Sequence, residues 1–580
     1  MKTYTGIPAS AGIAIGVAFI YRENDTPEIP HYSIKKNQVE GEWEKLQKAL
    51  NQAGEELKTL CKRAKKEISR EQAEIFQAHL MMLEDPDFHD QLLDRLKASL
   101  HNIEWIVWDV SREISQKLMM SPDPVFRERT DDITDVSRRI INNLLSVTHN
   151  RLSLAELDRD VILVARNIMP SDALVMNKTH VKGIALDEGS KTSHTAILAR
   201  AFGIPAVLGL SIISREITDG EILTLNGTSG VVAVNPDKKT LALQEDEEKQ
   251  QRRQSNRLAA LRDLPAQTTD GHRVALKANI GFPEEAENAL AFGAEGIGLY
   301  RSEFLFITPG KTADEETQYN AYSRVLKTMG KLPVTIRTVD IGGDKIIPEF
   351  ATNNEKNPLL GWRAIRLSLA NPDLFKVQLR AILRASVNGN ARVMFPMISG
   401  IEELVHACLL LNEARAECRK KKQPAARNIE VGTMIETPSA AMTADILCEK
   451  SGFFSIGTND LIQYTLAVDR GNEKVSYLGE PYHPAVLRLI KKIIDAAHEK
   501  GIKAGMCGEL AGDPSATAIL LGLGLDEFSM TASSIPQIKQ IIRGTSLKSC
   551  RALAAKCLRK RSIADVRASV KTWMKIRNEE

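Results

Sequence analysis

Apolar residues follow two alternating patterns along the second half of the chain. Short apolar runs predict strands at Val274–Ile280, Gly296–Tyr300, Val334–Val339, Val393–Met397, Val431–Ile435, Phe453–Ile456, Ala504–Met506 and Asp526–Met530. Segments with apolar residues at helical spacing separate these runs. Repeated strand–helix units predict a closed (β/α)8, TIM-like barrel for residues 263–580. An open, doubly wound sheet is the alternative, and the lack of a Gly-rich nucleotide turn argues against it.

Other patterns occupy the first half of the chain. Large and small residues alternate over Ile13–Phe19, which predicts strands in residues 1–22. Residues 23–147 contain few Gly or Pro and keep helical spacing, which predicts a bundle of four helices. Strand patterns return in residues 148–236 and end in a hairpin through Asn226–Gly227. The fold class is therefore α/β, with a β-rich α/β domain that contains an inserted α-helical bundle, followed by the barrel.

The composition of the chain argues against several classes of binding partner and of cellular setting. The chain of 580 residues has 77 Lys and Arg against 74 Asp and Glu, and its net charge of +3 argues for neither nucleic acid nor a membrane. The apolar stretch Gly6–Ile20 could imitate a signal peptide, but Pro8, Gly12 and Gly16 interrupt it, so a strand is preferred. The 7 cysteines form no CxxC pair, which predicts a reducing, cytoplasmic setting without disulfides or a zinc site.

The segment Gly189–Arg200 carries the first candidate chemistry. A short apolar run precedes it, and a helix is predicted from Thr195 to Phe202, so His194 stands at a helix N-terminus. The positive end of the helix disfavours an imidazolium, and its free N–H groups can hold a phosphate. The alternative is that Ser193 caps an ordinary helix and His194 is merely its neighbour.

A second group of polar residues follows the predicted strands of the barrel. Its members are Arg301, Arg337, Arg363, Glu436, Asn459, Asp460, Arg470 and Cys507. In a barrel these strand ends gather on one face. Two like charges at ~4 Å repel by roughly 4 kcal/mol at an effective dielectric of about 20. A cluster of arginines is therefore stable only if a strongly anionic group balances its charge. The pattern indicates a small ligand with phosphate and carboxylate groups, and Glu436 and Asp460 suit Mg²⁺. Any one of the arginines alone could be a surface ion pair.

Several segments carry a family resemblance. They are Lys191–Ala196, Gly298–Phe306, Asp340–Lys345, Asn357–Pro358, Gly361–Arg366, Phe454–Asp460, Tyr464–Asn472 and Met506–Pro514. From end to end the chain resembles enzyme I of the bacterial phosphoenolpyruvate:sugar phosphotransferase system. The resemblance implies a phosphoenolpyruvate-protein phosphotransferase, which performs the first step of sugar uptake and releases pyruvate.

The resemblance also implies residue roles. His194 would be phosphorylated, at Nε2, and Cys507 would give a proton to the enolate carbon. Phosphoenolpyruvate would be held by Arg301, Arg337, Asn459, Asp460 and Arg470, with Arg363 as an additional contact. Mg²⁺ would be held by Glu436 and Asp460.

The predicted bundle resembles the part of the family that docks the small histidine-bearing carrier HPr. Acidic residues that could face basic groups on that carrier are Glu71, Glu74, Glu84 and Asp85, and the alternative for them is a solvated helix face. His79 is expected to be a packing or capping histidine. The family also implies a homodimer through the barrel. Because one histidine must visit both the barrel and the carrier, its domain is expected to swing about a helical linker at residues 237–262.

Two departures and two competing interpretations accompany the resemblance. Ser190 and Lys191 replace the usual Gly-Arg before Thr-Ser-His, and Ser302 replaces the common Thr after Arg301. A dikinase or phosphoenolpyruvate synthase shares the histidine domain and barrel, but it needs a large ATP-binding domain for which the sequence offers no candidate. A regulatory protein of the family, which binds a partner without efficient phosphotransfer, would be indicated by loss of a site residue, and none is lost.

Overall fold

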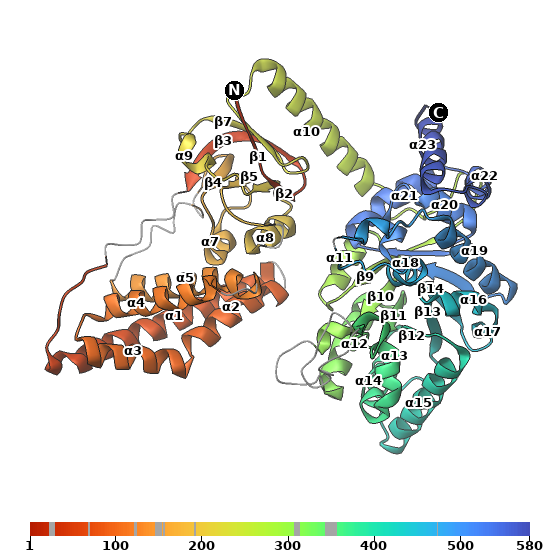
Figure 1. The fold of residues 1–580 in the computed structure, drawn as a ribbon, viewed down its shortest axis with the longest axis horizontal. Coiled ribbons are helices and arrows are strands. Elements are labelled where there is room, and N and C mark those ends of the chain that lie inside the picture. The colour runs from red at the N-terminus through yellow and green to blue at the C-terminus, as the bar shows by residue number, and fades with distance from the viewer. Residues whose placement is uncertain are drawn as a thin grey trace. The chain divides into compact units, whose positions relative to one another are not determined.

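The chain divides into two compact units, Met1–Gln254 and Ser255–Glu580. The computed structural model describes residues 1–21, 29–67, 70–120, 124–145, 154, 157–190, 193–306, 314–342, 357–472 and 474–579. Helix α10 (Lys238–Ala259) crosses the boundary between the units (Figure 1). Its residues are predominantly polar, as the sequence pattern of this segment predicts.

A mixed sheet forms the strand-rich part of the first unit. Within the described residues its order is β1-β8-β7-β3-β4-β5-β6-β2. The strands are β1 (Lys2–Thr5), β2 (Ile7–Ser10), β3 (Ile13–Tyr21), β4 (Val161–Ala165), β5 (Val181–Leu186), β6 (Ala206–Leu208), β7 (Ile222–Asn226) and β8 (Val231–Val234). Strands β3 to β6 are parallel, and β7 and β8 form the predicted antiparallel hairpin. Because β3 pairs with both β4 and β7, the strand before the bundle joins the strands that follow it.

The helices between β3 and β4 form the inserted bundle, which has its own apolar core. They are α1 (Val39–Glu67), α2 (Arg70–Leu83), α3 (Pro86–Ser99), α4 (Ile103–Met119) and α5 (Pro124–Leu144), and they lie side by side (Figure 1). The prediction of four helices was wrong because it missed α3. The carboxylate of Asp85 caps α3 by accepting from the N–H of Asp87 at 2.9 Å, and Pro86 starts the helix. His79 is buried with its Nε2 3.0 Å from Asp132, which confirms a packing role.

The second unit is a closed barrel of parallel strands, which confirms the predicted fold class and excludes an open sheet. Its strands are β9 (Ala275–Ile280), β10 (Ile297–Arg301), β11 (Pro333–Arg337), β12 (Asn390–Phe395), β13 (Glu430–Ile435), β14 (Phe453–Ile456), β15 (Lys503–Met506) and β16 (Glu527–Met530). Each overlaps a strand that the apolar runs predict. Strand β9 pairs with both β10 and β16 and thereby closes the barrel.

Helices of both units connect and cover these strands. In the first unit they include α7 (Pro170–Val175), α8 (His194–Phe202) and α9 (Ile213–Glu216). In the second unit they are α11 (Glu285–Ala291), α12 (Glu315–Met329), α13 (Ala364–Ala370), α14 (Pro372–Ala385), α15 (Ile401–Lys420), α16 (Pro438–Met442), α17 (Ala444–Leu447), α18 (Thr458–Leu466), α19 (Pro484–Glu499), α20 (Thr517–Leu523), α21 (Ile535–Arg543), α22 (Leu547–Leu558) and α23 (Ile563–Glu579). Among the described helices, none is both long and apolar enough to cross a membrane.

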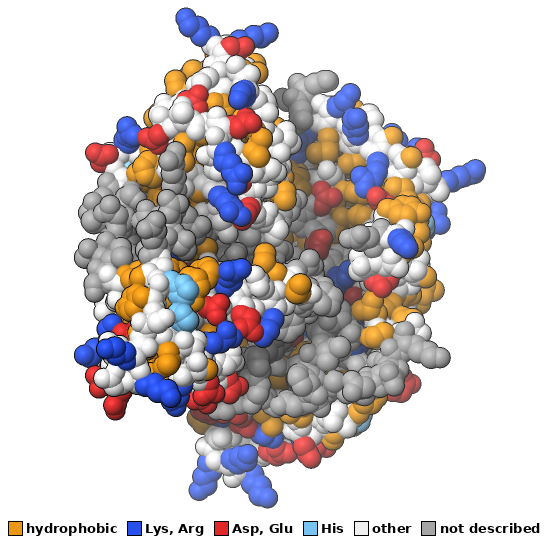
Figure 2. Space-filling model, turned by 60° about the vertical axis from the view of Figure 1, so that its left-hand side comes forward, with side chains coloured by type: hydrophobic (Ala, Val, Ile, Leu, Met, Phe, Trp, Pro, Cys, Tyr) orange, Lys and Arg blue, Asp and Glu red, His pale blue; other side chains and the backbone are white. Residues whose placement is uncertain are grey.

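The surface carries charges of both signs. On the face drawn in Figure 2, Lys and Arg side chains lie among Asp and Glu side chains, which agrees with the net charge of +3.

The first two N–H groups of α22 donate to the carboxylate of Asp270, and the effect of these bonds on the pKa of Asp270 can be tested. Asp270 accepts hydrogen bonds from Thr268 Oγ1 and from the N–H groups of Leu547 and Lys548, which lower its pKa from 3.8 to about 2. Because the folded pKa is depressed, the stabilisation is present above pH 3.8 and is lost as the pH falls through about 2.

We expect Asp270→Asn to lower the thermal unfolding temperature at neutral pH, because a neutral amide is a weaker acceptor for these N–H groups than a carboxylate. The difference from the parent chain should shrink as the pH falls below about 4. The control is Asp263→Asn, which removes an exposed carboxylate paired with its neighbour Arg262. A difference between parent and Asp270→Asn that does not change with pH would contradict this assignment.

Candidate active site at the carboxyl ends of the barrel strands

The barrel brings most of the sequence-predicted site residues to one rim. Arg301 ends β10 and Arg337 ends β11, while Glu436 and Cys507 directly follow β13 and β15. Asn459 and Asp460 lie in the first turn of α18, which follows β14. All strands of the barrel are parallel, so these positions share the carboxyl-end face on which barrel enzymes place their chemistry.

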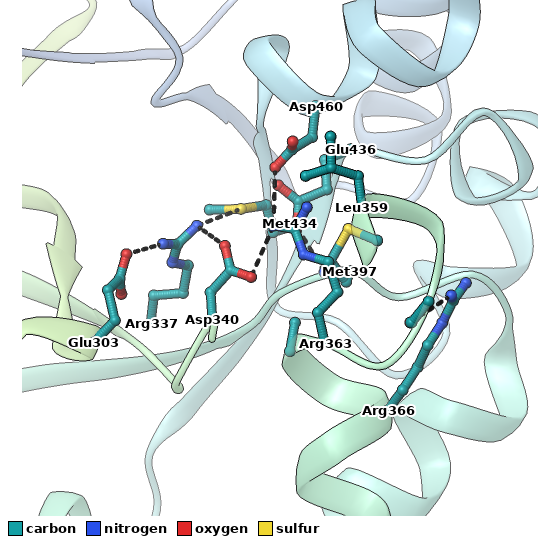
Figure 3. Close-up of polar contacts among 12 residues, drawn as sticks. Glu303, Arg337, Asp340, Leu359, Arg363, Arg366, Met397, Met434, Glu436 and Asp460 are labelled. Carbon is teal, nitrogen blue, oxygen red and sulfur yellow. Dashed lines mark hydrogen bonds and ion pairs between the residues drawn. The ribbon is translucent and has the colours of Figure 1, made fainter. Parts of the chain in front are cut away.

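Arg337 is buried at this rim between two carboxylates (Figure 3). Its Nη2 donates to Glu303 Oε1 at 2.5 Å, and its Nη1 lies 2.9 Å from Asp340 Oδ2. Burial works against the charged guanidinium, but Glu303 and Asp340 outweigh burial and raise the pKa of Arg337. The guanidinium is therefore a fixed positive charge in a largely water-free place, where its field is strong.

Asp340 links Arg337 to a second buried guanidinium (Figure 3). Its Oδ1 lies 2.9 Å from Nη2 of Arg363, and that Nη2 is also 3.5 Å from Oδ2 of Asp460. On the other side, Arg363 Nη1 donates to the Tyr464 hydroxyl at 3.1 Å, and this hydroxyl donates to a backbone carbonyl. From the sequence, an external anion was expected to balance the charge of the arginines. For Arg337 and Arg363 that expectation was incomplete, because carboxylates of the chain already pair with both.

Glu436 and Asp460 form the acidic side of the site. Burial, with Asp460 and Asp340 nearby, raises the pKa of Glu436 to about 8. Glu436 Oε1 accepts from the N–H of Met397 at 2.6 Å, and a side chain in place of Gly457 would have its Cβ 2.6 Å from Glu436 Oε2. Oδ1 of Asp460 is buried and makes no hydrogen bond within the described residues.

This donor set fits a magnesium ion that is shared with a ligand. Among the described residues no group of three or more His, Cys, Asp and Glu is arranged to hold a metal. Mg²⁺ commonly takes one or two carboxylates from the protein and completes its shell with phosphate oxygens and water. Two hard oxygen ligands, one with a free buried oxygen, meet that requirement without a complete cage.

Two residues beside these groups have left-handed backbone conformations. Met397, which donates to Glu436, has φ 55°, and Ala364, which follows Arg363, has φ 52°. Such conformations cost energy for a residue with a side chain, and they concentrate at functional sites. The Ala364 N–H donates to the carbonyl of Ile341 at 2.9 Å, which fixes the turn that presents Arg363.

Cys507 lies buried near the same charges. Burial raises the pKa of its thiol, and a hydrogen bond with Ser455 and the charges of Arg337 and Arg301 only partly oppose that effect. The side chain therefore carries a proton rather than a charge. Its backbone N–H donates to the carbonyl of Ile456 at 3.1 Å, which fixes Cys507 at the end of β15.

A cavity of about 390 Å³ opens beside α18. Its polar lining includes Thr458, Asn459, Gln463, Arg470 and Glu509. The Asn459 amide group donates to Glu509 Oε1 at 3.2 Å and accepts from the Glu509 N–H at 3.1 Å, so it is held in one orientation. Arg301 and Arg470 are exposed, unlike Arg337 and Arg363. The candidate guanidiniums thus differ, because Arg337 and Arg363 are buried and paired with carboxylates whereas Arg301 and Arg470 are accessible to solvent.

His194 lies in the first unit, as the first residue of α8. Ser193 caps this helix by accepting from the Ala196 N–H at 3.4 Å, and Gly203 ends it with φ 67°, as the sequence predicts. The His194 side chain, Lys191 and Thr192 lie outside the described part of the chain, as do the side chains of Glu71 and Glu74.

Three residues of the site lie in segments that resemble the family, but the sequence predicted no role for them. Glu303 and Asp340 hold Arg337, and Tyr464 holds Arg363. Asp340 stands three residues after Arg337, which was the available signal, but many acidic residues follow barrel strands at similar distances. The sequence does not show which of them turn inward.

Comparisons with known proteins cover both units. Three family descriptions match: "PEP-utilising enzyme, PEP-binding domain" over residues 255–547, "PEP-utilising enzyme, N-terminal" over residues 5–129, and "PEP-utilising enzyme, mobile domain" over residues 157–230. A phosphoenolpyruvate-protein phosphotransferase of a Bacillus species is 43% identical over 93% of this chain and 94% of its own length. The chain belongs to the phosphoenolpyruvate-protein phosphotransferase family. Proteins of the same name from Staphylococcus carnosus and Haemophilus influenzae are each 41% identical over 97% of this chain, and the matches cover 98% and 97% of their respective lengths.

This membership confirms the family that the sequence motifs indicated. The strand-end candidates from Arg301 to Cys507 all lie within the match to the PEP-binding domain. His194 lies within the match to the mobile domain. The candidate nucleophile and the candidate substrate site therefore belong to different matched segments, as they belong to different units of the structure.

Proposed function

We propose that the protein transfers the phosphoryl group of phosphoenolpyruvate to His194, and from there to a histidine of a small carrier protein, HPr. The observation that carries this proposal is the pair of buried guanidiniums, Arg337 and Arg363, held at the barrel rim beside Glu436 and Asp460. Planar guanidiniums suit phosphate and carboxylate, which are the two anionic groups of phosphoenolpyruvate.

In the first half of the reaction, neutral His194 attacks phosphorus in line with the bond to the enol oxygen. A bond from nitrogen to phosphorus forms, the bond from phosphorus to the enol oxygen breaks, and the electron pair goes to the enolate. Arg337 and Arg363 stabilise the charge in transit, because they are fixed by Glu303 and Asp340 before substrate arrives. Asn459, Arg301 and Arg470 complete the binding of the substrate.

Glu436 and Asp460 would hold Mg²⁺ at this site. When bound, the ion would neutralise charge on the phosphoryl oxygens. Coordination requires ionised carboxylates, and the raised pKa of Glu436 means that the ion competes with a proton for that group.

In the second half of the reaction, Cys507 gives its proton to the enolate carbon, which yields pyruvate. The buried thiol is suited to this step because its raised pKa keeps it protonated. The resulting thiolate lies near Arg337, whose positive charge favours it until a proton returns from solvent.

The same proposal includes the surface that docks the carrier, the oligomeric state, the cellular location and a movement of the domain. The bundle of α1 to α5 docks HPr, the barrels of two copies form a homodimer, and the protein acts in the cytoplasm. A swing of the His194-bearing part about α10 brings the histidine alternately to the barrel and to the carrier.

A labelling experiment tests the function. Purified protein is incubated with phosphoenolpyruvate labelled in its phosphoryl group, in one arm with Mg²⁺ and in another with EDTA. We expect acid-labile, base-stable label on the chain and one pyruvate per label with Mg²⁺, and label near background with EDTA, because Glu436 and Asp460 then lack their ion. Addition of HPr should remove the label from the chain and place it on the carrier.

Labelled ATP in place of phosphoenolpyruvate is the control and should leave the chain unlabelled. Equal labelling from ATP would indicate a dikinase instead. Absence of label from phosphoenolpyruvate with Mg²⁺ would contradict the proposed function altogether.

A further inference from the structure

A buried amide behind the barrel rim connects two of the strands that carry the arginines. Gln378 lies on α14 and is 1% exposed. Its Nε2 donates to Ser302 Oγ and to the Tyr322 hydroxyl, each at 3.0 Å, and its Oε1 accepts from the N–H of Val339 at 3.0 Å. Both hydrogens of the amide and its carbonyl oxygen are therefore engaged, which fixes its orientation.

Ser302 carries this connection to the site. Its hydroxyl is fully buried and donates to the backbone carbonyl of Arg337 at 2.7 Å, while it accepts from Gln378. Ser302 stands between Arg301 and Glu303, and Val339 stands between Arg337 and Asp340 along the rim. The segments after β10 and β11 are thus joined by one side chain from outside the barrel.

We propose that Gln378 is a positioning residue, which sets the relative placement of the β10 and β11 ends and through them of Arg301, Glu303 and Arg337. The part of this inference that concerns phosphoenolpyruvate rests on the proposed function. Gln378 itself touches no reacting atom and acts through Ser302 and the Val339 N–H.

The physical reason is that the side-chain ion pairs alone do not fix the backbone. The Arg337 guanidinium is held by Glu303 and Asp340, but long side chains can keep an ion pair while their strands shift. Small displacements of Arg301 and Arg337 weaken their contacts with a bound anion, because charge-assisted hydrogen bonds depend on distance and direction. Hydrogen bonds to Val339 N–H and Arg337 C=O act on the main chain and so remove that freedom.

The first test compares Gln378→Met with Ile382→Ala. Methionine keeps the length of the side chain and loses all of its hydrogen bonds, whereas Ile382 is a fully buried apolar residue of the same helix, so its truncation weakens packing and leaves the polar contacts intact. We expect Gln378→Met to raise KM for phosphoenolpyruvate about tenfold with a smaller change in kcat, because binding is weakened in ground state and transition state alike. Ile382→Ala should lower the unfolding temperature and keep the parent KM. Ser302→Ala should resemble Gln378→Met, and the double variant should lose little more.

The second readout does not depend on activity. Hydrogen exchange of the backbone amides is measured over residues 299–306 and 336–342 in both variants. We expect faster exchange there in Gln378→Met than in Ile382→Ala at matched stability. Unchanged exchange in Gln378→Met, or a parent KM in that variant, would overturn the positioning role. If the parent chain takes no label from phosphoenolpyruvate, the proposed function fails, and hydrogen exchange alone decides the role of Gln378.

Discussion

A His194→Ala variant is expected to take no phosphoryl group from phosphoenolpyruvate and to pass none to HPr. The imidazole is the proposed nucleophile, and alanine offers no atom that can accept phosphorus. Ser193 still caps α8, so the helix should persist and the loss should be chemical rather than structural. The measurement is radiolabel on the purified chain after incubation with labelled phosphoenolpyruvate and Mg²⁺.

His180→Ala is the matched control for this experiment. His180 lies in the same unit, just before β5, and its Nδ1 is 3.0 Å from Asp160. This variant should be labelled as well as the parent. Label that persists at the parent level in His194→Ala would refute His194 as the phosphoryl acceptor and would direct attention to another histidine.

Arg337→Lys is expected to lower kcat/KM for phosphoenolpyruvate by about a hundredfold, within the range found when one donor to a developing charge is removed. Lysine keeps the positive charge but lacks the planar fork that now contacts both Glu303 and Asp340. An ammonium is a compact charge without the rigid pair of Nη donors, so it cannot span Glu303 and Asp340 in this geometry or present donors to the substrate in the same fixed directions.

Arg392→Lys is the comparison for this substitution. Arg392 belongs to β12 and pairs with Glu430, the first residue of β13, so it lies toward the opposite end of the barrel. It should leave kcat/KM unchanged. Arg337→Met should be more harmful than Arg337→Lys, because removing one partner of a buried ion pair costs about 3–5 kcal/mol of stability. A parent kcat/KM in Arg337→Lys would show that Arg337 does not contact the substrate.

The sequence predicts the barrel well because its strands are short, apolar and buried. Phe453–Ile456 is predicted with its observed bounds, since Gly452 and Gly457 flank it and every residue between them is buried. Helix α3 escapes prediction for the opposite reason. Only Glu84 and Asp85 separate it from α2, and only Leu92 and Leu96 are buried among its residues. Few apolar positions next to a Pro are typical of the end of the preceding helix, so the sequence pattern does not predict a new helix there.

The candidate site, too, was only partly predictable from the sequence. Residue types just past strand ends indicate Arg337, Glu436 and Asp460 as candidates, because parallel strands of a barrel end on one face, whereas Arg363 directly precedes α13. Ion pairing among them depends on side-chain direction, which residue type does not encode. The bridging role of Asp340 and the buried link from Gln378 to Ser302 therefore required the structure.

The pairing of β9 with β16 has a consequence for synthesis on the ribosome. The buried ion pair of Lys277 with Glu527 also joins these strands, so the barrel cannot close until the last strand has left the exit tunnel. The first unit ends at Gln254 and needs no residue of the second for its sheet. At about 5–20 residues per second, the roughly 280 residues up to Met530 take roughly 15–55 s to emerge. Until β16 emerges, the apolar side chains of the earlier barrel strands lack the neighbours that bury them in the finished barrel, while the N-terminal unit already has every strand of its sheet.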